Sequence, residues 1–572
     1  MLGSSTKRGM TRRLPSSTTR MRMRMASVAS ERRVLVSTTT SSVMRIPHSH
    51  DASSSSSSSS SSWRRRKRVV GRPRPPHQAA RAVLDGAPPA ADTSSSSCLD
   101  SDSDSGKPRV IIAGGGIGGL CAALALQSKG IPFTLYEKVK EYKPFGGPIQ
   151  LQCNALESLE AIDMSVARQI MDLGTITGDR INGLLDGKTG EWYLRFDTRK
   201  PALKKGLPLT LVLNRYVLLD ILKGAVKPES MTLGKRVESY EEVSAEDSPT
   251  GKAFVEVRFD DGSKTIGDVI VAADGINSTV RKQVRTRGND EATYSGYTCY
   301  TATCDFELED VEKIGYQVYL GNGQYFVASD VGEGKTQWYA FKAQEPGIKD
   351  ESGDVRGNLL ELFKDWSADV RARFEATLEE DIEQRDIYDR RPVFNWVKGK
   401  VALLGDSAHS MQPNMGQGGC QAIEDGYVLA DVLSRCNMEE GDGCIQQALN
   451  EYGRRRCARA ASIHGFARSA ALMTTTWRPY LGSDPYSFYS YIPGAMQFWS
   501  ALEKLKIPHP GKVIGQVMMM VSIDLILEYI ACGGPVSEED RVKYCQVPGV
   551  GVPKRDLPKD AFKMNGIPGF AE

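Results

Sequence analysis

A glycine-rich hexapeptide between two strand-like segments constrains the fold of this chain more than any other feature. Residues 109–113 have the short apolar pattern of a buried strand, and Gly-Gly-Gly-Ile-Gly-Gly follows at 114–119. A small-residue helix is predicted at 120–126, and a second strand at 133–136 ends at Glu137. A strand, a G-x-G-x-x-G turn and a helix in this order are typical of a unit that binds a dinucleotide.

Each glycine of this motif meets a separate physical demand. Gly114 permits the tight turn, Gly116 lets the backbone approach a pyrophosphate, and Gly119 lets helix and strand pack closely. The helix N-terminus offers N–H groups and the positive end of its dipole to the phosphates. Glu137 lies 23 residues after Gly114, where a carboxylate accepts the ribose hydroxyls of an adenosine. The motif predicts a dinucleotide site without choosing between FAD and NAD.

Two later strands end in acidic loops that extend this site. One apolar run ends in Asp274 and Gly275, and the other ends in Gly405 and Asp406. Loops at the carboxyl ends of parallel strands meet at one edge of a doubly wound sheet, so these acids are expected beside the glycine loop. An Asp next to Gly is, taken alone, more often a cap or turn residue. The combination with 114–119 favours ligand binding.

A Pro- and Gly-rich loop follows the last of these strands. It runs from Met411 to Gly419, and a helix that carries Glu424 and Asp425 is expected from Cys420. A glycine loop that enters a helix N-terminus is an anion site, and it suits the pyrimidine edge of a flavin, which becomes negative on reduction. This second site favours a flavin as the resident cofactor.

The order of these motifs resembles the aromatic-hydroxylase class of FAD-dependent monooxygenases. Arg215, in the stretch 214–218, matches the arginine that reaches the flavin cofactor from a helix in that class. The resemblance implies an α/β fold in which an FAD-binding, Rossmann-like doubly wound domain is interleaved with a mixed β-sheet substrate domain. The implied regions are the FAD domain at 106–475, its substrate sheet at about 174–262 and 290–395, and a helical C-terminal region at 476–572.

Longer strings are similar to the zeaxanthin epoxidase family. They are Gly147–Leu156, Thr177–Gly183, Tyr294–Tyr300, Arg385–Arg390, Gln412–Cys420 and Lys506–Gly511. The resemblance implies a plastid FAD enzyme that epoxidises the β-rings of zeaxanthin to antheraxanthin and then violaxanthin, with NAD(P)H and O2. It also implies electron supply linked to ferredoxin and contact with the thylakoid or envelope membrane.

The site residues predicted from these motifs all bind FAD. They are Gly114, Gly116, Gly118, Gly119, Glu137, Lys138, Arg215, Asp274, Gly275, Gly405, Asp406, Pro413, Gly416, Gln417, Gly418 and Gly419. Among them, Arg215, Asp274 and Asp406 are assigned to ribityl, pyrophosphate and ribose, and 416–419 to the isoalloxazine.

The chemistry requires no catalytic side chain. Epoxidation of an alkene needs an electrophilic oxygen, which a flavin C4a-hydroperoxide supplies without a metal in a site that excludes water. The alkene itself attacks, so we interpret His409 as a structural histidine near the flavin. Because the chain has six histidines and three of them precede residue 105, a His-rich metal site is not expected. A second G-x-G-x-x-G is missing, so NAD(P)H is expected to bind transiently.

Two features depart from the resembled family. Plant members extend into a forkhead-associated domain, for which this chain leaves no room before Glu572, so regulation through that domain is not expected. The family also has an arginine where this chain has Gly146. That contact is either lost or supplied from elsewhere, with Lys143 as one substitute.

The near-neutral net charge of +3 hides two regions of opposite sign. Residues 1–84 hold 18 basic residues against two acidic ones, a net +16, which leaves −13 on 85–572. The Ser- and Arg-rich segment 1–105 has no apolar signal stretch, and we interpret it as a disordered plastid transit peptide and linker. A basic tail that binds RNA or lipid is the alternative. The acidic body argues against a nucleic-acid partner, and eleven scattered cysteines suit a reducing compartment.

The stretch 513–532 is strongly apolar but contains Gln516, Asp524 and Glu528, which count against a membrane-spanning helix. We expect either a helix that faces lipid or lines a substrate tunnel, or a Met-rich helix packed on the core. Aromatic strands such as 324–329 either line a slot for a polyene or form sheet core.

Two other functions fit the same motifs. One is a related ring hydroxylase that acts on a small phenolic acid. The other is a non-catalytic carotenoid- or flavin-binding photoprotective protein.

Overall fold

The computed structural model describes residues 106–143, 146–285, 290–307, 310, 313–478, 501, 504–505, 510–544, 557 and 561. The predicted leader at 1–105 lies outside the described residues.

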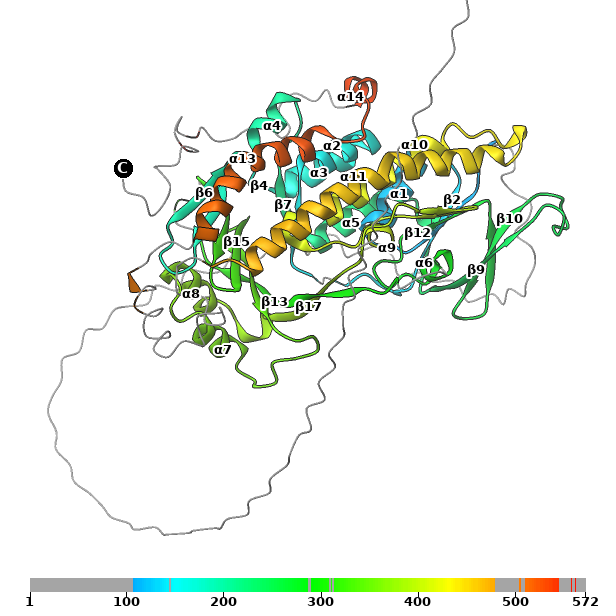
Figure 1. Cartoon of the computed structure of the whole chain (residues 1–572). Coiled ribbons are helices and arrows are strands. Elements are labelled where there is room, and N and C mark those ends of the chain that lie inside the picture. Colours follow the sequence, from blue (N-terminus) through cyan, green and yellow to red (C-terminus); the bar gives the residue numbers. More distant parts are fainter. Residues whose placement is uncertain are drawn as a thin grey trace, which may run out of the picture. The chain divides into compact units, whose positions relative to one another are not determined.

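A six-stranded sheet contains the three buried strands that the sequence predicts (Figure 1). Its order is β18-β19-β12-β1-β2-β8, and all neighbours are parallel except β18 and β19. The strands are β1 (Val110–Ala113), β2 (Phe133–Glu137), β8 (Met231–Leu233), β12 (Val269–Ala272), β18 (Val397–Lys398) and β19 (Val401–Leu403). Every residue of β1 and β12 is buried, as expected of a parallel sheet covered on both faces. The predicted doubly wound sheet is confirmed.

The register of this sheet aligns the carboxyl ends of four strands. Ala113 of β1 is paired with Tyr136 of β2 and with Ala272 of β12. Ala272 is in turn paired with Leu403 of β19. The loops that follow these strands therefore begin side by side.

The helices that cover the sheet approach one another closely. They are α1 (Ile117–Ser128), α2 (Cys153–Ile162), α3 (Met164–Leu173), α5 (Arg215–Ala225), α6 (Thr279–Val284), α9 (Asp406–His409), α10 (Gly418–Leu433) and α11 (Gly443–Thr475). A Cβ on Gly426 of α10 would lie 2.8 Å from the backbone nitrogen of Ala122 in α1. α10 begins at Gly418, before the predicted start at Cys420. The prediction missed this start because glycines carry no apolar signal for the beginning of a helix.

A seven-stranded sheet forms a second layer, in the order β17-β13-β16-β15-β14-β5-β6. Its strands are β5 (Ile181–Asp186), β6 (Trp192–Phe196), β13 (Thr293–Asp305), β14 (Ile314–Leu320), β15 (Gln324–Gly332), β16 (Lys335–Ala343) and β17 (Glu383–Asp389). One face packs through Phe326 and Trp338 on α7 (Val355–Leu362) and α8 (Ala368–Glu375). Side chains alternate along a strand, so the opposite face carries Tyr297, Tyr325 and Phe341.

Two small sheets hold the remaining strands. One has the order β3-β7-β4 and the other β11-β10-β9. Their strands are β3 (Pro148–Leu151), β4 (Thr175–Ile176), β7 (Leu211–Asn214), β9 (Val237–Val243), β10 (Phe254–Phe259) and β11 (Lys264–Gly267). Of the predicted sheet segment 174–262, only β5 and β6 join the seven-stranded sheet. The others do not, because α5 and β8 carry the chain back to the six-stranded sheet.

Short helical turns complete the body, and further helices follow it along the chain. The turns and the small helix are α4 (Arg199–Lys204), η2 (Pro228–Ser230), η3 (Glu379–Asp381), η4 (Pro413–Met415) and η5 (Met438–Glu440). The later helices are α13 (Pro510–Cys532) and α14 (Glu538–Tyr544). Within α13, Val513–Ala531 has a mean hydropathy of 1.7 and is long and apolar enough to cross a membrane.

Candidate functional site

The glycine loop after β1 is closed on one side and open on the other. A Cβ on Gly114, whose φ is +107°, would lie 2.5 Å from the carbonyl oxygen of Ala273 after β12. A Cβ on Gly119 would lie 1.9 Å from the carbonyl oxygen of Gly114, so only glycine fits there. Around a Cβ on Gly116, in contrast, no described atom lies within 4 Å. The backbone at Gly116 is thus accessible to a ligand, as the sequence predicts.

The N-terminus of α1 faces this opening without a capping side chain. Its N-cap is Gly116, which offers no side-chain oxygen, and its first turn has no acidic residue. The first N–H groups are therefore free to bind an anion. Gly118 has a different surrounding from its neighbours, because its Cβ would lie 2.7 Å from Cδ2 of Leu404 and 3.1 Å from Cβ of Ala422. Its position serves the packing of α1.

Glu137 and Tyr142 hold the loop from the side of β2. The buried carboxylate of Glu137 accepts the N–H of Gly115 at 2.6 Å and the N–H of Val139 at 3.0 Å. The hydroxyl of Tyr142 donates to the carbonyl oxygen of Gly115 at 2.7 Å. Burial, and then the charge of Glu137, raise the pKa of Tyr142. Tyr142 is a residue that sequence reasoning missed, while the predicted Lys138 is exposed.

Asp274 has one oxygen bonded and one buried without a partner. Its Oδ2 accepts the N–H of Thr279 at 2.8 Å, which is the turn role that Asp before Gly commonly has. Its Oδ1 is buried and has no hydrogen-bond partner among the described residues. Burial raises the pKa of Asp274 above its usual value, against the hydrogen bonds from Ser278 and Thr279. The next residue, Gly275, is also open, because no described atom lies within 4 Å of a Cβ placed on it.

Arg281 ties this loop to the one after β19. The guanidinium, 1% exposed, donates through Nη1 to the carbonyl oxygens of Ser407 at 2.6 Å and Ala408 at 2.9 Å. Its Nε pairs with Oδ2 of Asp290 at 2.7 Å. Arg281 is not among the site residues predicted from the sequence.

The Gly-Asp motif forms the start of α9. The N–H of Gly405 donates to Oδ2 of Asp425 at 3.0 Å, which anchors the turn, and Asp406 is exposed as the first residue of the helix. The buried ring of His409 bonds through Nε2 to the same oxygen of Asp425 at 2.7 Å. This contact supports the interpretation of His409 as a structural residue.

A buried ion cluster fixes α10 against α11 behind this motif. Arg456 donates to Oδ1 of Asp425 at 2.7 Å and to Oε2 of Glu424 at 2.5 Å, and all three residues are fully buried. Arg459 binds both oxygens of Glu424 at 2.8 Å. Burial alone would raise the pKa of Glu424, but Arg456 and Arg459 outweigh it and hold the carboxylate ionised. The two acids noted in the sequence therefore support the site and do not line it.

The Pro- and Gly-rich loop leads into an uncapped helix. A Cβ on Gly416 would lie 2.8 Å from Oε1 of Gln150 in β3, so the loop rests on that small sheet. The side chain of Gln417 is fully buried and exchanges hydrogen bonds with Asn154 at 3.1 and 3.3 Å. Only its backbone faces the loop. No side chain caps the N-terminus of α10, where Gly418 and Gly419 lie.

The aromatic face of the seven-stranded sheet touches this loop. The hydroxyl of Tyr297 lies 3.0 Å from Oε1 of Gln412 and 3.1 Å from Oδ1 of Asn414. Asn414 also donates through Nδ2 to the hydroxyl of Tyr325 at 3.0 Å. Tyr325 stacks on Phe341 with 4.1 Å between ring centroids. These polar links join the seven-stranded sheet to the loop, and the sequence contained no signal for them.

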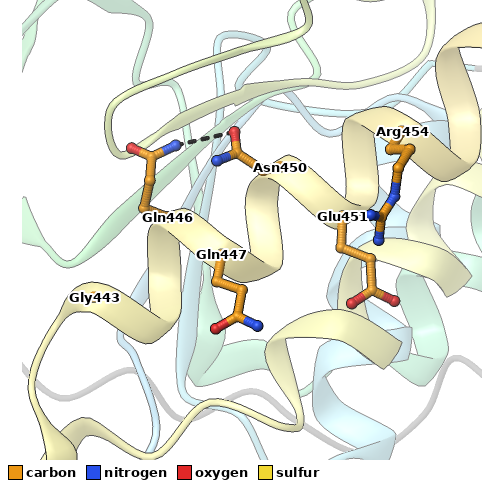
Figure 2. Close-up of a pocket in the computed structure, with 6 residues that line it drawn as sticks. All are labelled: Gly443, Gln446, Gln447, Asn450, Glu451 and Arg454. Carbon is orange, nitrogen blue, oxygen red and sulfur yellow. Dashed lines mark hydrogen bonds between the residues drawn. The ribbon is translucent and has the colours of Figure 1, made fainter. Parts of the chain in front are cut away.

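Two of the hollows on the described surface bear on the position of the site. One, of about 420 Å³, is bordered by Gly146 and Gly147, by Tyr216 next to the exposed Arg215, and by Thr301 and other residues of the seven-stranded sheet. The other, of about 550 Å³, lies along the first turns of α11, where Nε2 of Gln446 donates to Oδ1 of Asn450 at 3.2 Å (Figure 2). None of the predicted site residues lines either hollow, but the first lies beside Arg215, because a Cβ on its lining residue Gly146 would be 3.3 Å from Cδ of that arginine.

These loops define a doubly wound, glycine-loop protein with a second, aromatic sheet set against its nucleotide edge. The chain belongs to the FAD binding domain family, whose pattern matches residues 107–467. FAD is therefore the cofactor of this fold. Among the described residues, no group of three or more His, Cys, Asp or Glu side chains could hold a metal ion.

Curated relatives and solved structures agree with this family. Chloroplastic zeaxanthin epoxidase of Oryza sativa subsp. japonica is 46% identical over 451 residues, which are 77% of this chain and 65% of that protein. The Arabidopsis thaliana counterpart is 43% identical over 442 residues, 76% of this chain and 63% of that protein. The chain thus spans just under two thirds of the length of these relatives.

Solved structures show the same architecture. Klebsiella pneumoniae HpxO, complexed with FAD and uric acid, has a TM-score of 0.60 at 26% identity, covering 75% of this chain and 98% of that one. A salicylate hydroxylase substrate complex has a TM-score of 0.55 at 20% identity, covering 75% of this chain and 99% of that one, and shows the fold alone.

The residues of this site fit FAD. The glycine loop is open at Gly116, and the N-termini of α1 and α10 have no capping side chains. A buried oxygen of Asp274 has no partner among the described residues, and the carboxylate of Asp406 is exposed. The positions offer anion-binding N–H groups for the phosphates of FAD and acceptors for its hydroxyl groups.

Proposed function

We propose that this chain is an FAD-dependent monooxygenase that epoxidises the β-rings of zeaxanthin to antheraxanthin and violaxanthin, using NAD(P)H and O2. The observation that carries the proposal is the 46% identity over 451 residues to a protein named zeaxanthin epoxidase. An identity this high over 77% of the chain supports a shared substrate as well as a shared fold.

The chain's own residues would hold the cofactor from three sides. The N–H groups of α1 beside Gly116 would bind the pyrophosphate, and Glu137 the adenosine ribose. Arg215, Asp274 and Asp406 would contact the polar middle of the cofactor. The N-terminus of α10 would face the isoalloxazine, where its dipole favours negative charge.

Bound and reduced FAD supplies the activation of O2 that oxygen transfer to an alkene requires. The protein's contribution is to orient the substrate and exclude water. The face that carries Tyr297, Tyr325 and Phe341 is buried and apolar apart from its hydroxyls. A conjugated polyene could lie against such a face, and a dry site limits loss of the reactive oxygen to water.

We further propose a plastid location with peripheral contact to the thylakoid or envelope membrane. The rice and Arabidopsis relatives are named chloroplastic, which supports the plastid. The apolar substrate supports the membrane contact, because a carotenoid must be drawn from lipid. An electron supply linked to ferredoxin belongs to the same proposal.

The decisive experiment incubates the full chain, loaded with FAD in lipid vesicles, with zeaxanthin, NADPH and a ferredoxin system. Chromatography should show antheraxanthin first and violaxanthin later, each dependent on O2. Protein that retains FAD but forms no antheraxanthin would overturn the proposal.

The same assay separates the other candidate functions. HpxO, at 26% identity, was crystallised with uric acid, so soluble aromatic compounds are a necessary arm of the test. If uric acid or salicylate stimulated NADPH oxidation and zeaxanthin did not, the chain would be a ring hydroxylase. Bound pigment without an oxygen-dependent product would indicate a non-catalytic binding protein.

A further inference from the structure

The outer face of α13 is a row of exposed apolar side chains. The row consists of Ile514, Val517, Met518, Val521 and Leu525. These residues recur at intervals of three and four, so they lie along one side of the helix. Their exposed fractions are 63%, 41%, 63%, 69% and 68%. A contiguous apolar surface of this kind marks contact with an apolar partner.

The opposite side of α13 is packed on the protein. Gln516 and Ile530 are buried, and Met519 and Ile523 pack against the cluster on the aromatic face of the seven-stranded sheet. The helix contacts α2, α4, β6 and α11. One side of α13 is therefore held against the protein. The apolar row on its other side is exposed to a surface that runs parallel to the helix axis.

A basic edge runs beside the apolar row. Nζ of Lys204 in α4 lies 2.5 Å from Oε1 of Glu528 in α13. Lys204, and then Lys200 and Lys205, lower the pKa of Glu528, so three lysine charges gather at this end of the helix. Leu203, which lies between these lysines in sequence, is 47% exposed.

We propose that the apolar row of α13 and the lysine edge of α4 form a docking surface for an anionic lipid bilayer. The helix lies in the plane of the interface, with the row among the acyl chains and the lysines among the headgroups. The row matches the acyl chains of such a membrane and the lysines match its anionic headgroups. A purely apolar protein partner would leave the lysines without a counter-charge. This inference deepens the membrane contact proposed above, and it rests on the proposed function only where zeaxanthin is the readout.

Vesicle sedimentation with the full chain tests the docking surface directly. Vesicles with and without anionic phospholipid are compared at low and high salt. We expect binding to anionic vesicles that weakens with salt, and at least ten-fold less bound protein for the double variant Val521→Asn with Leu525→Asn. Lys200→Glu should weaken binding to anionic vesicles, and Lys200→Arg should preserve it.

A matched control removes equally exposed apolar side chains elsewhere. Ile348 and Phe394 are 51% and 71% exposed and lie in loops of the body. The double variant Ile348→Asn with Phe394→Asn should bind vesicles as the wild type does. Equal binding by the Val521/Leu525 variant and the wild type would overturn the proposal. So would an oligomer in gel filtration that this variant dissociates while its vesicle binding is unchanged.

A second readout separates this proposal from the proposed enzyme activity. The Val521/Leu525 variant should epoxidise detergent-dispersed zeaxanthin at the wild-type rate but lose at least ten-fold on vesicle-embedded zeaxanthin. Equal losses on both substrates would place these residues in the catalytic body and overturn the docking role. Vesicle binding by a wild type that epoxidises neither substrate would overturn the proposed function and leave the docking surface intact.

Discussion

Gly146 lies directly against Arg215. A Cβ on Gly146 would be 3.3 Å from Cδ of Arg215, and the φ angle of Gly146 is +94°. The resembled family has an arginine at position 146. In this chain a larger residue there would be held in a left-handed backbone conformation and would crowd Arg215. A side chain at position 146 would therefore displace the arginine that the resemblance assigns to the cofactor.

Restoring the family residue should harm this protein. Gly146→Arg should lower the free energy of unfolding by about 1–2 kcal/mol, because a side chain at positive φ is strained. It should also lower FAD content by displacing Arg215. Thermal unfolding and flavin absorbance of the purified protein measure the two effects. As control, Gly465→Ala in α11 has free space and should be neutral or stabilise by up to about 1 kcal/mol. A Gly146→Arg protein with the wild-type midpoint and flavin content would contradict the proposed role of Arg215.

Asp406 and Asp274 should respond differently to substitution. Asp406 is exposed, so Asp406→Ala should leave apoprotein stability within about 0.5 kcal/mol and cut FAD occupancy. Asp274→Ala removes an acceptor of the Thr279 N–H and should cost about 1 kcal/mol even without FAD. Flavin titration and thermal unfolding of the apoproteins distinguish the two. Full flavin content in Asp406→Ala would show that its assignment is wrong.

Arg281 should be essential for the loop after β19. Arg281→Ala leaves the carbonyl groups of Ser407 and Ala408 without their buried donor, which should cost about 3 kcal/mol or more and lower FAD content. Arg285→Ala is the matched control, because this partly exposed neighbour pairs with the same Asp290 and should cost about 1 kcal/mol at most. Urea unfolding gives both values. Similar losses in the two variants would argue against the tie between the loops.

Gln516→Leu should stabilise the protein. The amide is 1% exposed, and neither its nitrogen nor its oxygen has a partner among the described residues. Replacing an unsatisfied buried polar group by an apolar one of similar size should raise stability by about 1–3 kcal/mol. The exposed Gln446 in α11 is the control, and its change to Leu should be neutral within about 0.5 kcal/mol. A lower unfolding midpoint for Gln516→Leu would indicate that the amide has a partner.

Glu157 should make stability depend on pH. Burial, against the charge of Arg541, raises the pKa of this α2 carboxyl from 4.5 to about 7. Between pH 4.5 and 7 the folded state therefore holds a proton that the unfolded state has lost. Stability should fall by up to about 3 kcal/mol as pH rises through this window and level off above it. The fall should be absent in Glu157→Gln, and thermal midpoints of both proteins from pH 4 to 8 test it. Parallel pH profiles would contradict the raised pKa.

The nucleotide half of the site was predictable because its signals are local. Gly114, Gly116 and Gly119 fall at a fixed spacing between one strand and the helix that follows it, and the three apolar strands are short runs typical of a buried parallel sheet. Parallel pairing then brings the carboxyl ends together, so the Asp-Gly and Gly-Asp loops fall beside the glycine loop. Each of these steps needs only neighbouring residues and the general geometry of parallel sheets.

The remaining features depend on packing between segments that are distant in the chain. Arg281 meets Ser407, Tyr297 meets Asn414, and Glu424 is buried with Arg459 only because the sheets and helices place them together. Composition could not show whether β9 and β10 join the substrate sheet or form one of their own. The sequence by itself determined the FAD-binding framework, because the tight turns and close backbone approaches of that framework require glycine at particular positions. Only the tertiary structure decided which charges are buried in pairs and which side of α13 is left exposed, since burial is a property of the packed chain.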